Sequence, residues 1–407
     1  MHAPAPAPAG IPGLSKTAFV SLMAMLMAIN AISIDIMLPG LQEIGASLGV
    51  ADENQRQLVL SSYMLGTGVT QLFFGPLSDR FGRKGALLGG LFVYTACAFA
   101  IAFVPTFSAL LILRFVQGAG AAATRVVTVS IVRDVYGGRQ MAEIMSLVFM
   151  VFMLVPVIAP SIGQLIMLFG EWHLIFLVVA AFGLFVAANV FFRLPETLKP
   201  ENRRDFTFRV IADGFRIVLT NRMALFYSLA TSVLFGSLFG FVNSSQQVFD
   251  GVYGLGVWFP LAFAAFAGTM ALASFVNSRL VKRFGMRHLS QTALLGFTVS
   301  SFLWMVASLS GFLPLWLFAI LYGATIFQFG LIVSNFNAMA MEPLGHVAGT
   351  ASSVLGFTQT ILGAVIGASI GQAFDGTVTP LAVSFFAIAL VAILLVLVAE
   401  GGRLFRT

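Results

Sequence analysis

The sequence Asp79-Arg-Phe-Gly-Arg-Lys84 lies between two long apolar segments, and a similar sequence, Lys282-Arg-Phe-Gly-Met-Arg287, lies between two others at an offset of 203 residues (282 minus 79). A sequence that recurs at matching places in the two halves of a membrane protein is typical of folds built from internal repeats. We therefore expect two similar halves, each containing several spans.

The composition is that of a membrane protein. Of the 407 residues 59% are hydrophobic, only 9% are charged and 42 are Phe, which is outside the range of soluble domains. A helix needs about 20 apolar residues to cross a bilayer. We expect an all-α polytopic fold of twelve transmembrane helices in two six-helix bundles. The apolar segments are 17–41, 56–76, 85–104, 107–131, 143–168, 172–193, 223–247, 256–280, 289–309, 313–336, 346–373 and 380–399.

The Lys and Arg residues orient these segments. Nineteen of the 22 fall on the side of the two termini, Arg56 alone falls on the other side, and Arg114 and Arg125 lie inside spans. Positive residues are retained on the cytoplasmic side of membrane proteins, so we expect both termini in the cytoplasm. Topology therefore explains the net charge of +6, and we expect no nucleic acid as a partner.

A polar, Arg-rich connection divides the spans six and six. The expected parts are a disordered leader 1–16, an N-terminal bundle 17–193, a cytoplasmic linker 194–221, a C-terminal bundle 222–400 and a tail 401–407. Cys97 is the one cysteine, and the four His residues lie at span ends far apart in the sequence. We therefore expect no disulfide, metal, cofactor or catalytic centre.

The stretch Asn30-Ala-Ile-Ser-Ile-Asp35 places a carboxylate inside the first apolar segment. An acid within a span is costly and points to function. At a rise of about 1.5 Å per residue, Asp35 lies about 27 Å into its helix from one side, and Arg114 about 12 Å into the fourth helix from the other. In a core about 30 Å thick these depths are similar. We expect the two groups to pair or to share a cavity, and the alternative is a static pair that only stabilises the bundle.

A polar face runs along the fourth expected helix, because eleven residues make close to three turns. A cationic face within a span is expected to line the interior. Arg125 on this face either attracts anionic or electron-rich molecules or is anchored by Glu143 or Asp134, and we expect the anchor. The face consists of Arg114, Gln117, Ala121, Arg125 and Thr128.

Neutral polar residues gather in the second half. Uncharged donors and acceptors among Phe and Met suit an adaptable pocket for apolar molecules, although single polar residues also join neighbouring helices. We expect the cargo to contact Asn30, Asp35, Arg114 and Gln117 in the first half. The second-half candidates are Asn243, Gln247, Tyr322, Gln328 and Asn335.

Several of these stretches resemble the motifs of one family. Gly75-Pro-Leu-Ser-Asp-Arg-Phe-Gly-Arg-Lys84 resembles the helix 2–3 loop signature of the major facilitator superfamily. Arg114-Phe-Val-Gln-Gly-Ala-Gly120 is similar to its helix 4 motif, and Ala159-Pro-Ser-Ile-Gly163 to the helix 5 motif of its antiporters. The likeness covers the whole chain, with departures at Gln164 and His173, where glycine and arginine are usual.

Further stretches look most like the Bcr/CflA group of bacterial drug:proton antiporters. They are Asp35 followed by Leu38-Pro39, then Arg125 and Arg133-Asp134-Val-Tyr136, and Ala348-Gly-Thr-Ala-Ser352. The resemblance implies proton-coupled efflux of apolar or neutral antibiotics, such as chloramphenicol- or bicyclomycin-like drugs, by alternating access. It also implies the bacterial inner membrane, and we expect a monomer. The alternative with the same fold is a proton-coupled transporter of a specific small metabolite.

The resemblance also suggests roles for individual residues. We expect protons and drug to compete for the cavity of Asp35, with Arg114 beside it. Asp79, Arg80, Arg83 and Lys84 are expected to latch the cytoplasmic gate, with Asp79 at the positive N-terminus of a helix that begins near Gly345. The plain alternative is that these basic residues only orient the chain. Pro156 and Pro160 remove two backbone donors from one span, so we expect a kink that serves as a hinge or only as packing.

Overall fold

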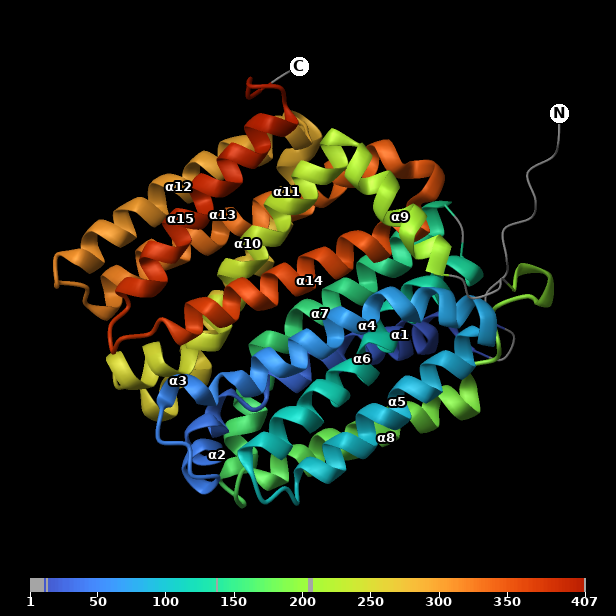
Figure 1. Cartoon of the computed structure of the whole chain (residues 1–407), viewed down its shortest axis with the longest axis horizontal. Coiled ribbons are helices and arrows are strands. Elements are labelled where there is room, and N and C mark those ends of the chain that lie inside the picture. The colour runs from blue at the N-terminus through green and yellow to red at the C-terminus, as the bar shows by residue number, and fades with distance from the viewer. Residues whose placement is uncertain (1–10, 12–13, 137, 204–207, 406–407) are drawn as a thin grey trace. The chain divides into compact units, whose positions relative to one another are not determined.

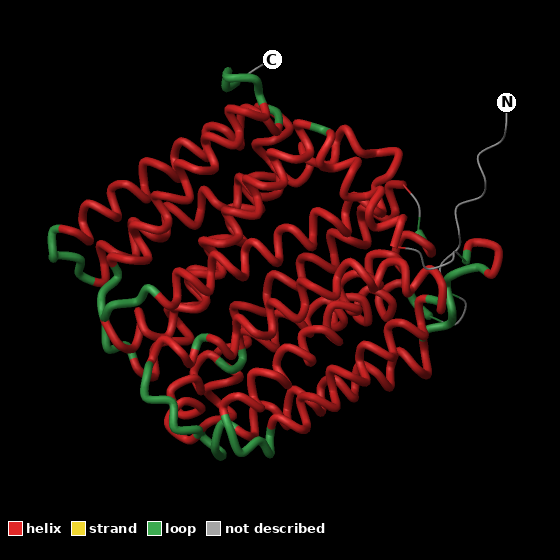
Figure 2. The backbone as a smooth tube through the Cα atoms, in the orientation of Figure 1, coloured by secondary structure: helices red, strands yellow, loops and turns green. Residues whose placement is uncertain are grey.

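The structure is a computed structural model that describes residues 11, 14–136, 138–203 and 208–405. These residues form helices joined by short connections and contain no strand (Figure 2). Figure 1 labels the α-helices in chain order. The elements are α1 (Lys16–Asp35), η1 (Leu38–Gly40), α2 (Leu41–Ser47), α3 (Glu53–Arg56), α4 (Leu58–Phe81), α5 (Arg83–Ile101), α6 (Phe107–Val135), α7 (Gly138–Met167), α8 (His173–Arg193), η2 (Pro200–Asn202), α9 (Phe208–Thr220), α10 (Arg222–Gln246), η3 (Gln247–Val252), η4 (Gly256–Trp258), α11 (Phe259–Phe284), α12 (Met286–Leu309), α13 (Leu315–Met341), η5 (Glu342–Val347), α14 (Ala348–Gln372) and α15 (Thr379–Ala399).

The chain folds into two compact units. The first is drawn from Met1–Met37 and Gly66–Thr207, and the second from Leu38–Leu65 and Phe208–Thr407. In the first unit α1 packs on α6 and α7, and α5 packs on α6 and α8. In the second unit α10 packs on α13 and α14, and α12 packs on α13 and α15. Helices at equivalent places in the repeat therefore make equivalent pairs.

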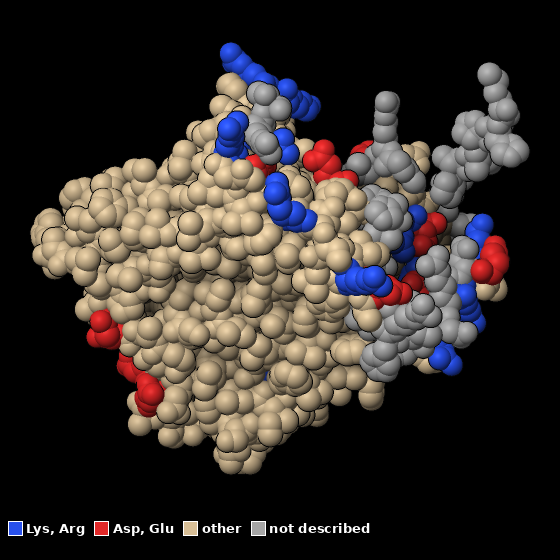
Figure 3. All heavy atoms as spheres, turned by 45° about the horizontal axis from the view of Figure 1, so that its top comes forward, with Lys and Arg blue, Asp and Glu red and all other residues tan. Residues whose placement is uncertain are grey.

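The helices are built for a bilayer. Eleven of those formed by described residues are long and apolar enough to cross a membrane, and α7 contributes a shorter apolar stretch of described residues, Leu154–Met167. Large apolar side chains lie on the outside, as with Phe92 and Phe192, which are 73% and 81% exposed. On the face drawn in Figure 3, charged side chains gather at helix ends and leave a wide uncharged surface. The protein is therefore a multi-pass membrane protein.

The first span is not one continuous helix. The expected segment 17–41 lies within the apolar span Lys16–Ser47, in which α1 ends at Asp35 and a single 3-10 turn, η1, precedes α2. Pro39 explains the break, since proline has no N–H to donate to the carbonyl of Asp35 four residues earlier. The residue before a proline is also disfavoured in helical conformation. The α-helix thus ends at the carboxylate.

The repeated sequence forms the same tight turn in each unit. Gly82 joins α4 to α5 with a φ of 90°, and Gly285 joins α11 to α12 with a φ of 77°. These angles lie in the left-handed region, which only glycine adopts without cost. The two positions are 203 residues apart (285 minus 82), the offset found in the sequence. The repeat therefore preserves a backbone geometry as well as a charge pattern.

The linker 194–221 contains a helix of its own, which the sequence analysis did not anticipate. Helix α9 packs on α14 and α10 in the second unit. Its described apolar residues lie on one side, where Val218 is buried and the ring of Phe215 meets that of Phe357 edge-on at 5.7 Å. Its charged residues Asp213 and Arg216 are exposed. Such a helix suits a membrane surface.

Gly90 and Gly120 let α5 and α6 approach closely. A Cβ at Gly90 would lie 2.4 Å from the Cβ of Ala123 and 2.7 Å from the carbonyl oxygen of Gly120. The neighbouring Gly89 has nothing within 4 Å of such an atom. One helix therefore offers a crowded and an open glycine side by side.

We predict that Gly90→Ala lowers the free energy of unfolding by about 1–3 kcal/mol, because the added methyl group overpacks the interface. Gly89→Ala is the matched control. It should leave stability unchanged or raise it by roughly 0.5–1 kcal/mol, since alanine favours the helix. Thermal unfolding of the purified protein in detergent measures both variants. Equal stability of the two would contradict the close approach of α5 and α6.

Candidate functional site

Asp35 is a buried carboxylate at the end of α1. Its side chain is in the first unit and the residue is only 5% exposed. The structure gives this carboxylate no hydrogen-bond or ion-pair partner among the described residues. A buried charge without a partner is costly. Asp35 is therefore the least compensated acid within the described spans.

Arg114 on α6 lies close to α1 but does not bind Asp35. Its guanidinium donates to the backbone carbonyl of Ser33 at 3.0 Å and to the side-chain oxygen of Gln117 at 2.8 Å. It also lies over the ring of Phe176 in α8, 5.8 Å from the centroid. Arg114 and Gln117 are fully buried. The expected neighbour relation of these two residues is thus present.

Helix geometry explains why Arg114 and Asp35 do not pair. Ser33 and Asp35 are two residues apart on α1, and such residues point to different sides of a helix. Arg114 meets the side of Ser33, whose hydroxyl lies 2.6 Å from that of Tyr94 in α5. The sequence predicted that Asp35 and Arg114 either pair or share a cavity, and the structure does not contain the pair. Ser33 and Tyr94 had no signal in the sequence, because one serine and one tyrosine in apolar spans are unremarkable.

Asn30 also joins α1 to α6. Its amide nitrogen donates to the hydroxyl of Thr124 at 3.0 Å and to the carbonyl of Ala121 at 3.3 Å. Asn30 and Arg114 thus join α1 to α6 at two points that are one turn of α1 apart, Asn30 and Ser33. These contacts hold α1 in place, and the backbone of α1 sets the direction in which the Asp35 side chain points.

Arg125 is not anchored as expected. Asp134 accepts from Arg83 at 2.8 Å, and Glu143 pairs with Lys16 at 2.7 Å, so neither acid is available. The expected ion pair of Arg125 with one of them is therefore wrong. Within the described part of the chain the Arg125 side chain is exposed and has no hydrogen-bond or ion-pair partner. The anchor failed because both acids lie nearer to other cations at the helix ends.

Helix α7 packs against α1 directly beside the carboxylate. A Cβ on Gly163 would lie 1.9 Å from the carbonyl oxygen of Ile36, the residue after Asp35. Glycine is therefore required there for the two backbones to touch. Pro156 and Pro160 lie inside the same helix, and Pro160 is buried. The expected hinge at these prolines stays a prediction.

Two of the expected gate residues, Asp79 and Arg83, form an ion cluster with Asp134 in the first unit. Arg83 is buried and binds Asp79 at 2.5 Å, Asp134 at 2.8 Å and the hydroxyl of Ser78 at 2.7 Å. Arg80 lies over the ring of Phe81, and the Lys84 ammonium donates to the carbonyl of Phe191 at 2.8 Å. Asp79 therefore has one partner in its own unit. The side chains of residues 346–350 lie outside the part that the structure describes, so the expected placement of Asp79 at that helix N-terminus stays a prediction.

Glu196 completes this cluster, and sequence reasoning missed it. Its carboxylate accepts from the backbone N–H groups of Arg83 at 2.9 Å and Lys84 at 3.1 Å, the first residues of α5. An acid at this position satisfies free donors and the helix dipole. Glu400 follows the last helix of the second unit in a similar way and pairs with Arg287 at 2.9 Å. The signal was the place of each acid just after a sixth span.

Aromatic side chains surround two unpartnered polar groups in the second unit. The ring of Tyr322 stacks on the rings of Phe241 and Phe318, with centroid distances of 4.4 Å and 5.5 Å. Its centroid lies 5.3 Å from that of Trp304. The Tyr322 hydroxyl and the Trp304 N–H are buried without a hydrogen-bond partner in the described part of the chain. Asn243 is likewise buried with neither amide atom bonded there. Such groups are costly unless a ligand or water meets them.

Gln247 belongs to an amide cluster, defined here as Asn54, Gln57, Gln247 and Gln372. The amide nitrogen of Gln57 donates to the side-chain oxygen of Gln247, and the amide nitrogen of Gln247 donates to the side-chain oxygen of Asn54 at 2.8 Å. Asn54 donates to the carbonyls of Phe374 at 2.9 Å and Gln372 at 3.1 Å. The cluster holds the segment Leu38–Leu65 on α10 and α14 within the second unit.

The remaining candidates join helices. Asn335 of α13 donates to the side-chain oxygen of Asn277 in α11 at 2.7 Å. Gln328 packs against Gly296 of α12, where an added Cβ would lie 2.9 Å from its amide. These contacts do not bring either residue to Tyr322 or Asn243. Whether any of these side chains binds cargo stays a prediction.

Comparison with known proteins places this geometry in a family. The sequence model described as the Major Facilitator Superfamily matches residues 20–368. A bicyclomycin resistance protein homolog of Haemophilus influenzae is 34% identical over 377 residues, which cover 92% of this chain and 94% of that protein. The multidrug resistance protein MdtL of Shewanella oneidensis is 31% identical and covers 82% of this chain and 83% of its own.

A solved structure gives the same fold. The bacterial homolog of the human lysosomal transporter Spinster, in an inward-facing and unoccupied conformation, superposes with a TM-score of 0.70 and 15% sequence identity. The match covers 95% of each chain. At this identity the likeness concerns the fold alone. The resemblance that the motifs indicated is confirmed by the sequence matches.

We predict that Arg114→Lys lowers the free energy of unfolding by about 2–4 kcal/mol. An ammonium group cannot reach the Ser33 carbonyl and Gln117 together as the guanidinium fork does, and hydrogen bonds to charged groups are worth about 1.5–3 kcal/mol each. Arg125→Lys on the same helix is the control and should change stability by less than about 0.5 kcal/mol. Thermal unfolding in detergent tests both, and an equal loss in the two variants would refute a special role of Arg114.

Proposed function

Because the chain belongs to the major facilitator superfamily, a family of transporters rather than enzymes, we propose that it exports drugs in exchange for protons. Asp35 carries the proton in this scheme. The observation that supports this most is the burial of the Asp35 carboxylate without a partner among the described residues. A carboxylate in that position must take up a proton, water or a cation whenever its surroundings close. Opening and closing of the site thus drives proton uptake and release.

Arg114 has a positioning role in the proposal. It donates to the carbonyl of Ser33, and Gly163 lets α7 pack directly on Ile36. The backbone is therefore held on both sides of Asp35. The carbonyl of Asp35, which receives no helical donor from Pro39, offers an acceptor at the same depth in this proposal. Coupling then depends on small movements of α7 and α1. Pro156 and Pro160 are the proposed hinge for them.

The cargo is proposed to be an apolar or neutral antibiotic of the chloramphenicol or bicyclomycin kind. The relatives named for bicyclomycin and multidrug resistance support this choice. In the second unit the stacked rings around Tyr322 and the unsatisfied amide of Asn243 suit an aromatic or weakly polar molecule. Arg125, which has no partner in the described chain, suits an electron-rich group on the cargo.

The proposed topology has twelve spans, because α7 is added to the eleven that are long and apolar enough, and it places both termini in the cytoplasm. The 30 residues of α7 suffice to cross a bilayer core about 30 Å thick. The Lys and Arg bias supports the orientation, and the bacterial relatives support the inner membrane. We further propose that the chain works as a monomer made of bundles 17–193 and 222–400.

Two gates follow from the ionic and amide clusters. We propose that Asp79, Arg80, Arg83 and Lys84 latch the cytoplasmic side, with Glu196 fixing the start of α5. The amide cluster is proposed to latch the opposite side. It ties the segment Leu38–Leu65, which the repeat assigns to the first half, to α10 and α14. These amide hydrogen bonds must break before cargo leaves.

We predict that Asp35→Asn abolishes proton-driven export and leaves the protein inserted and folded. The amide occupies the same space but cannot exchange a proton. Proteoliposomes with an imposed pH gradient measure drug-dependent proton movement, and growth of a susceptible bacterium across a panel of antibiotics measures resistance. Asp375→Asn, which changes an exposed acid outside the spans, is the control.

The outcomes separate the alternatives. Full drug-dependent proton exchange by Asp35→Asn would refute the assignment. Proton movement that needs Asp35, with no resistance to any drug of the panel, would favour the transporter of a specific metabolite. Asp35→Glu should keep part of the exchange, because it retains a carboxyl group displaced by one methylene.

We predict that Gln247→Ala favours the state open to the outside. The variant loses two amide hydrogen bonds, each worth about 0.5–1.5 kcal/mol, which is roughly a five-fold or larger shift in the equilibrium. Ser244→Cys in a Cys97→Ser background reports opening, because Ser244 is 2% exposed and one turn from Gln247. Its labelling by a membrane-impermeant thiol reagent should accelerate accordingly.

The adjacent Gln246→Ala is the control for this experiment. Among the described residues its amide makes one local hydrogen bond, to Asp250 at 3.4 Å. It should leave the labelling rate of the reporter cysteine unchanged. An unchanged rate in Gln247→Ala as well would mean that the amide cluster is no gate.

A further inference from the structure

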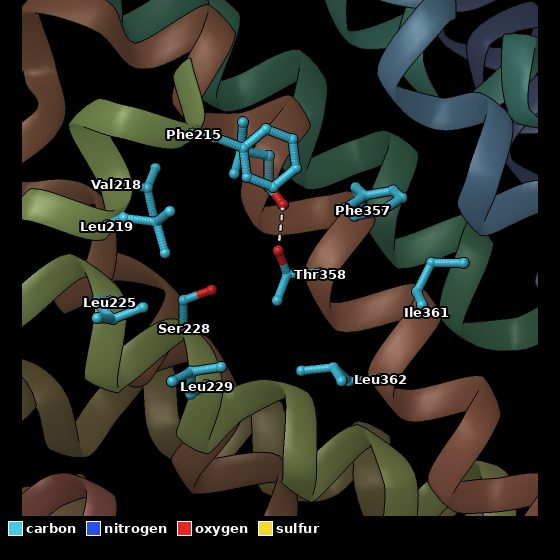
Figure 4. A pocket seen from close by; sticks show the side chains of 11 residues that line it. Phe215, Val218, Leu219, Leu225, Ser228, Leu229, Phe357, Thr358, Ile361 and Leu362 are labelled. Atoms are coloured by element: carbon cyan, nitrogen blue, oxygen red, sulfur yellow. Dashed lines mark hydrogen bonds between the residues drawn. The ribbon is translucent and has the colours of Figure 1, made fainter. Parts of the chain in front are cut away.

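A separate cavity lies beneath the linker helix of the second unit. It has a volume of about 240 Å³ and is lined by α9, α10 and α14. Figure 4 shows apolar side chains from all three helices around it, including Phe215 of α9, Leu229 of α10 and Leu362 of α14. The cavity is at the same end of the second unit as the linker. It takes no part in the proposed transport site.

One polar group in this cavity lacks a partner. Ser228 is 2% exposed, and its hydroxyl has no hydrogen bond in the described part of the chain. In Figure 4 this hydroxyl points into the cavity. The other hydroxyl of the lining, that of Thr358, is satisfied by the carbonyl of Val354 at 2.8 Å. A buried hydroxyl left unbonded is costly, so a ligand with an acceptor would stabilise it.

Two arginines lie on the helices that line the cavity. Arg222 is the first residue of α10 and shares a helix face with Leu225 and Leu229, which line the cavity. Arg216 follows Phe215 on α9. Both side chains are exposed, and neither has an ion pair among the described residues. The cavity therefore combines an apolar interior with one hydroxyl that lacks a partner among the described residues, and each of the helices α9 and α10 beside it carries an exposed arginine.

We infer that this cavity holds an acyl chain of an anionic phospholipid from the surrounding leaflet. The chain fills the apolar space, an ester carbonyl accepts from Ser228, and the phosphate pairs with Arg216 and Arg222. The amphipathic helix α9 lies at the level of lipid headgroups in this arrangement. A surface arginine attracts anionic lipid with about 1 kcal/mol.

The size of the cavity argues against the cargo as its occupant. Drug-sized molecules occupy sites of roughly 300–1,000 Å³ and are buried almost completely. At about 240 Å³ the cavity takes part of a longer molecule rather than a whole one. The two arginines on the helices beside it also do not suit a neutral drug. A bilayer lipid has the required apolar chain, carbonyl and anionic group in one molecule.

Lipid retention by the purified full-length protein tests the site. The protein is exchanged into detergent with dioleoyl phosphatidylglycerol or dioleoyl phosphatidylethanolamine, and bound lipid is counted by native mass spectrometry. The anionic lipid should be retained in preference to the zwitterionic one. Arg216→Gln and Arg222→Gln should each weaken its retention about five-fold. Ser228→Ala should weaken retention of both lipids without destabilising the protein.

Matched controls make the result specific. Lys282→Gln and Arg283→Gln remove two cations from the last turn of α11 in the same unit and should leave retention unchanged. Unchanged retention in the Arg216 and Arg222 variants would overturn the inference, as would equal retention of the two lipids. Displacement of the lipid by chloramphenicol would assign the cavity to the drug instead. Displacement by glycerol phosphate alone would reduce the site to a headgroup contact.

Binding is measured here without transport. Loss of proton exchange in Asp35→Asn leaves the lipid result untouched, and loss of lipid in the Arg216 and Arg222 variants leaves the role of Asp35 untouched. The two proposals therefore fail separately.

Discussion

The backbone N–H that proline lacks shapes the first unit. Within a bilayer every backbone group seeks an internal hydrogen bond, so a span stays helical unless something replaces the missing partner. Pro39 withholds the donor for the Asp35 carbonyl, and α1 ends there with its carboxylate at the break. Neighbouring helices must then hold the C-terminal end of α1 in place. Arg114 does so at Ser33, and Gly163 lets α7 press on Ile36.

This arrangement separates two tasks that the sequence places on one pair of charges. Arg114 donates to the carbonyl of Ser33 and to the side-chain amide of Gln117, and the first of these bonds joins α6 to α1. Asp35 is left without a partner in the described chain and keeps its capacity to change protonation. A direct ion pair would have compensated both charges and made the acid inert. The proposed coupling through Asp35 depends on this separation.

The ends of the helices show how the same unit serves two places in the chain. Gly82 and Gly285 make the same positive-φ turn, and Glu196 and Glu400 each supply an acid after the last helix of a unit. The polar interiors differ, however. The first unit holds charges, whereas the second holds stacked aromatic rings with unsatisfied neutral groups. Repeated architecture with unlike interiors fits the proposal that the two units bind a proton and an apolar cargo in different ways.

The sequence by itself determined the apolar spans, the repeat, the family and the buried position of Asp35, Arg114 and Gln117. Hydropathy, charge bias and helical periodicity act locally, so they can be read along one chain. Tertiary structure alone decided that Arg114 binds Ser33 rather than Asp35, that Asp134 and Glu143 serve Arg83 and Lys16 rather than Arg125, and that Gln247 joins an amide cluster. These choices depend on which neighbour lies within about 3 Å of a donor, and helix packing rather than sequence spacing sets that distance.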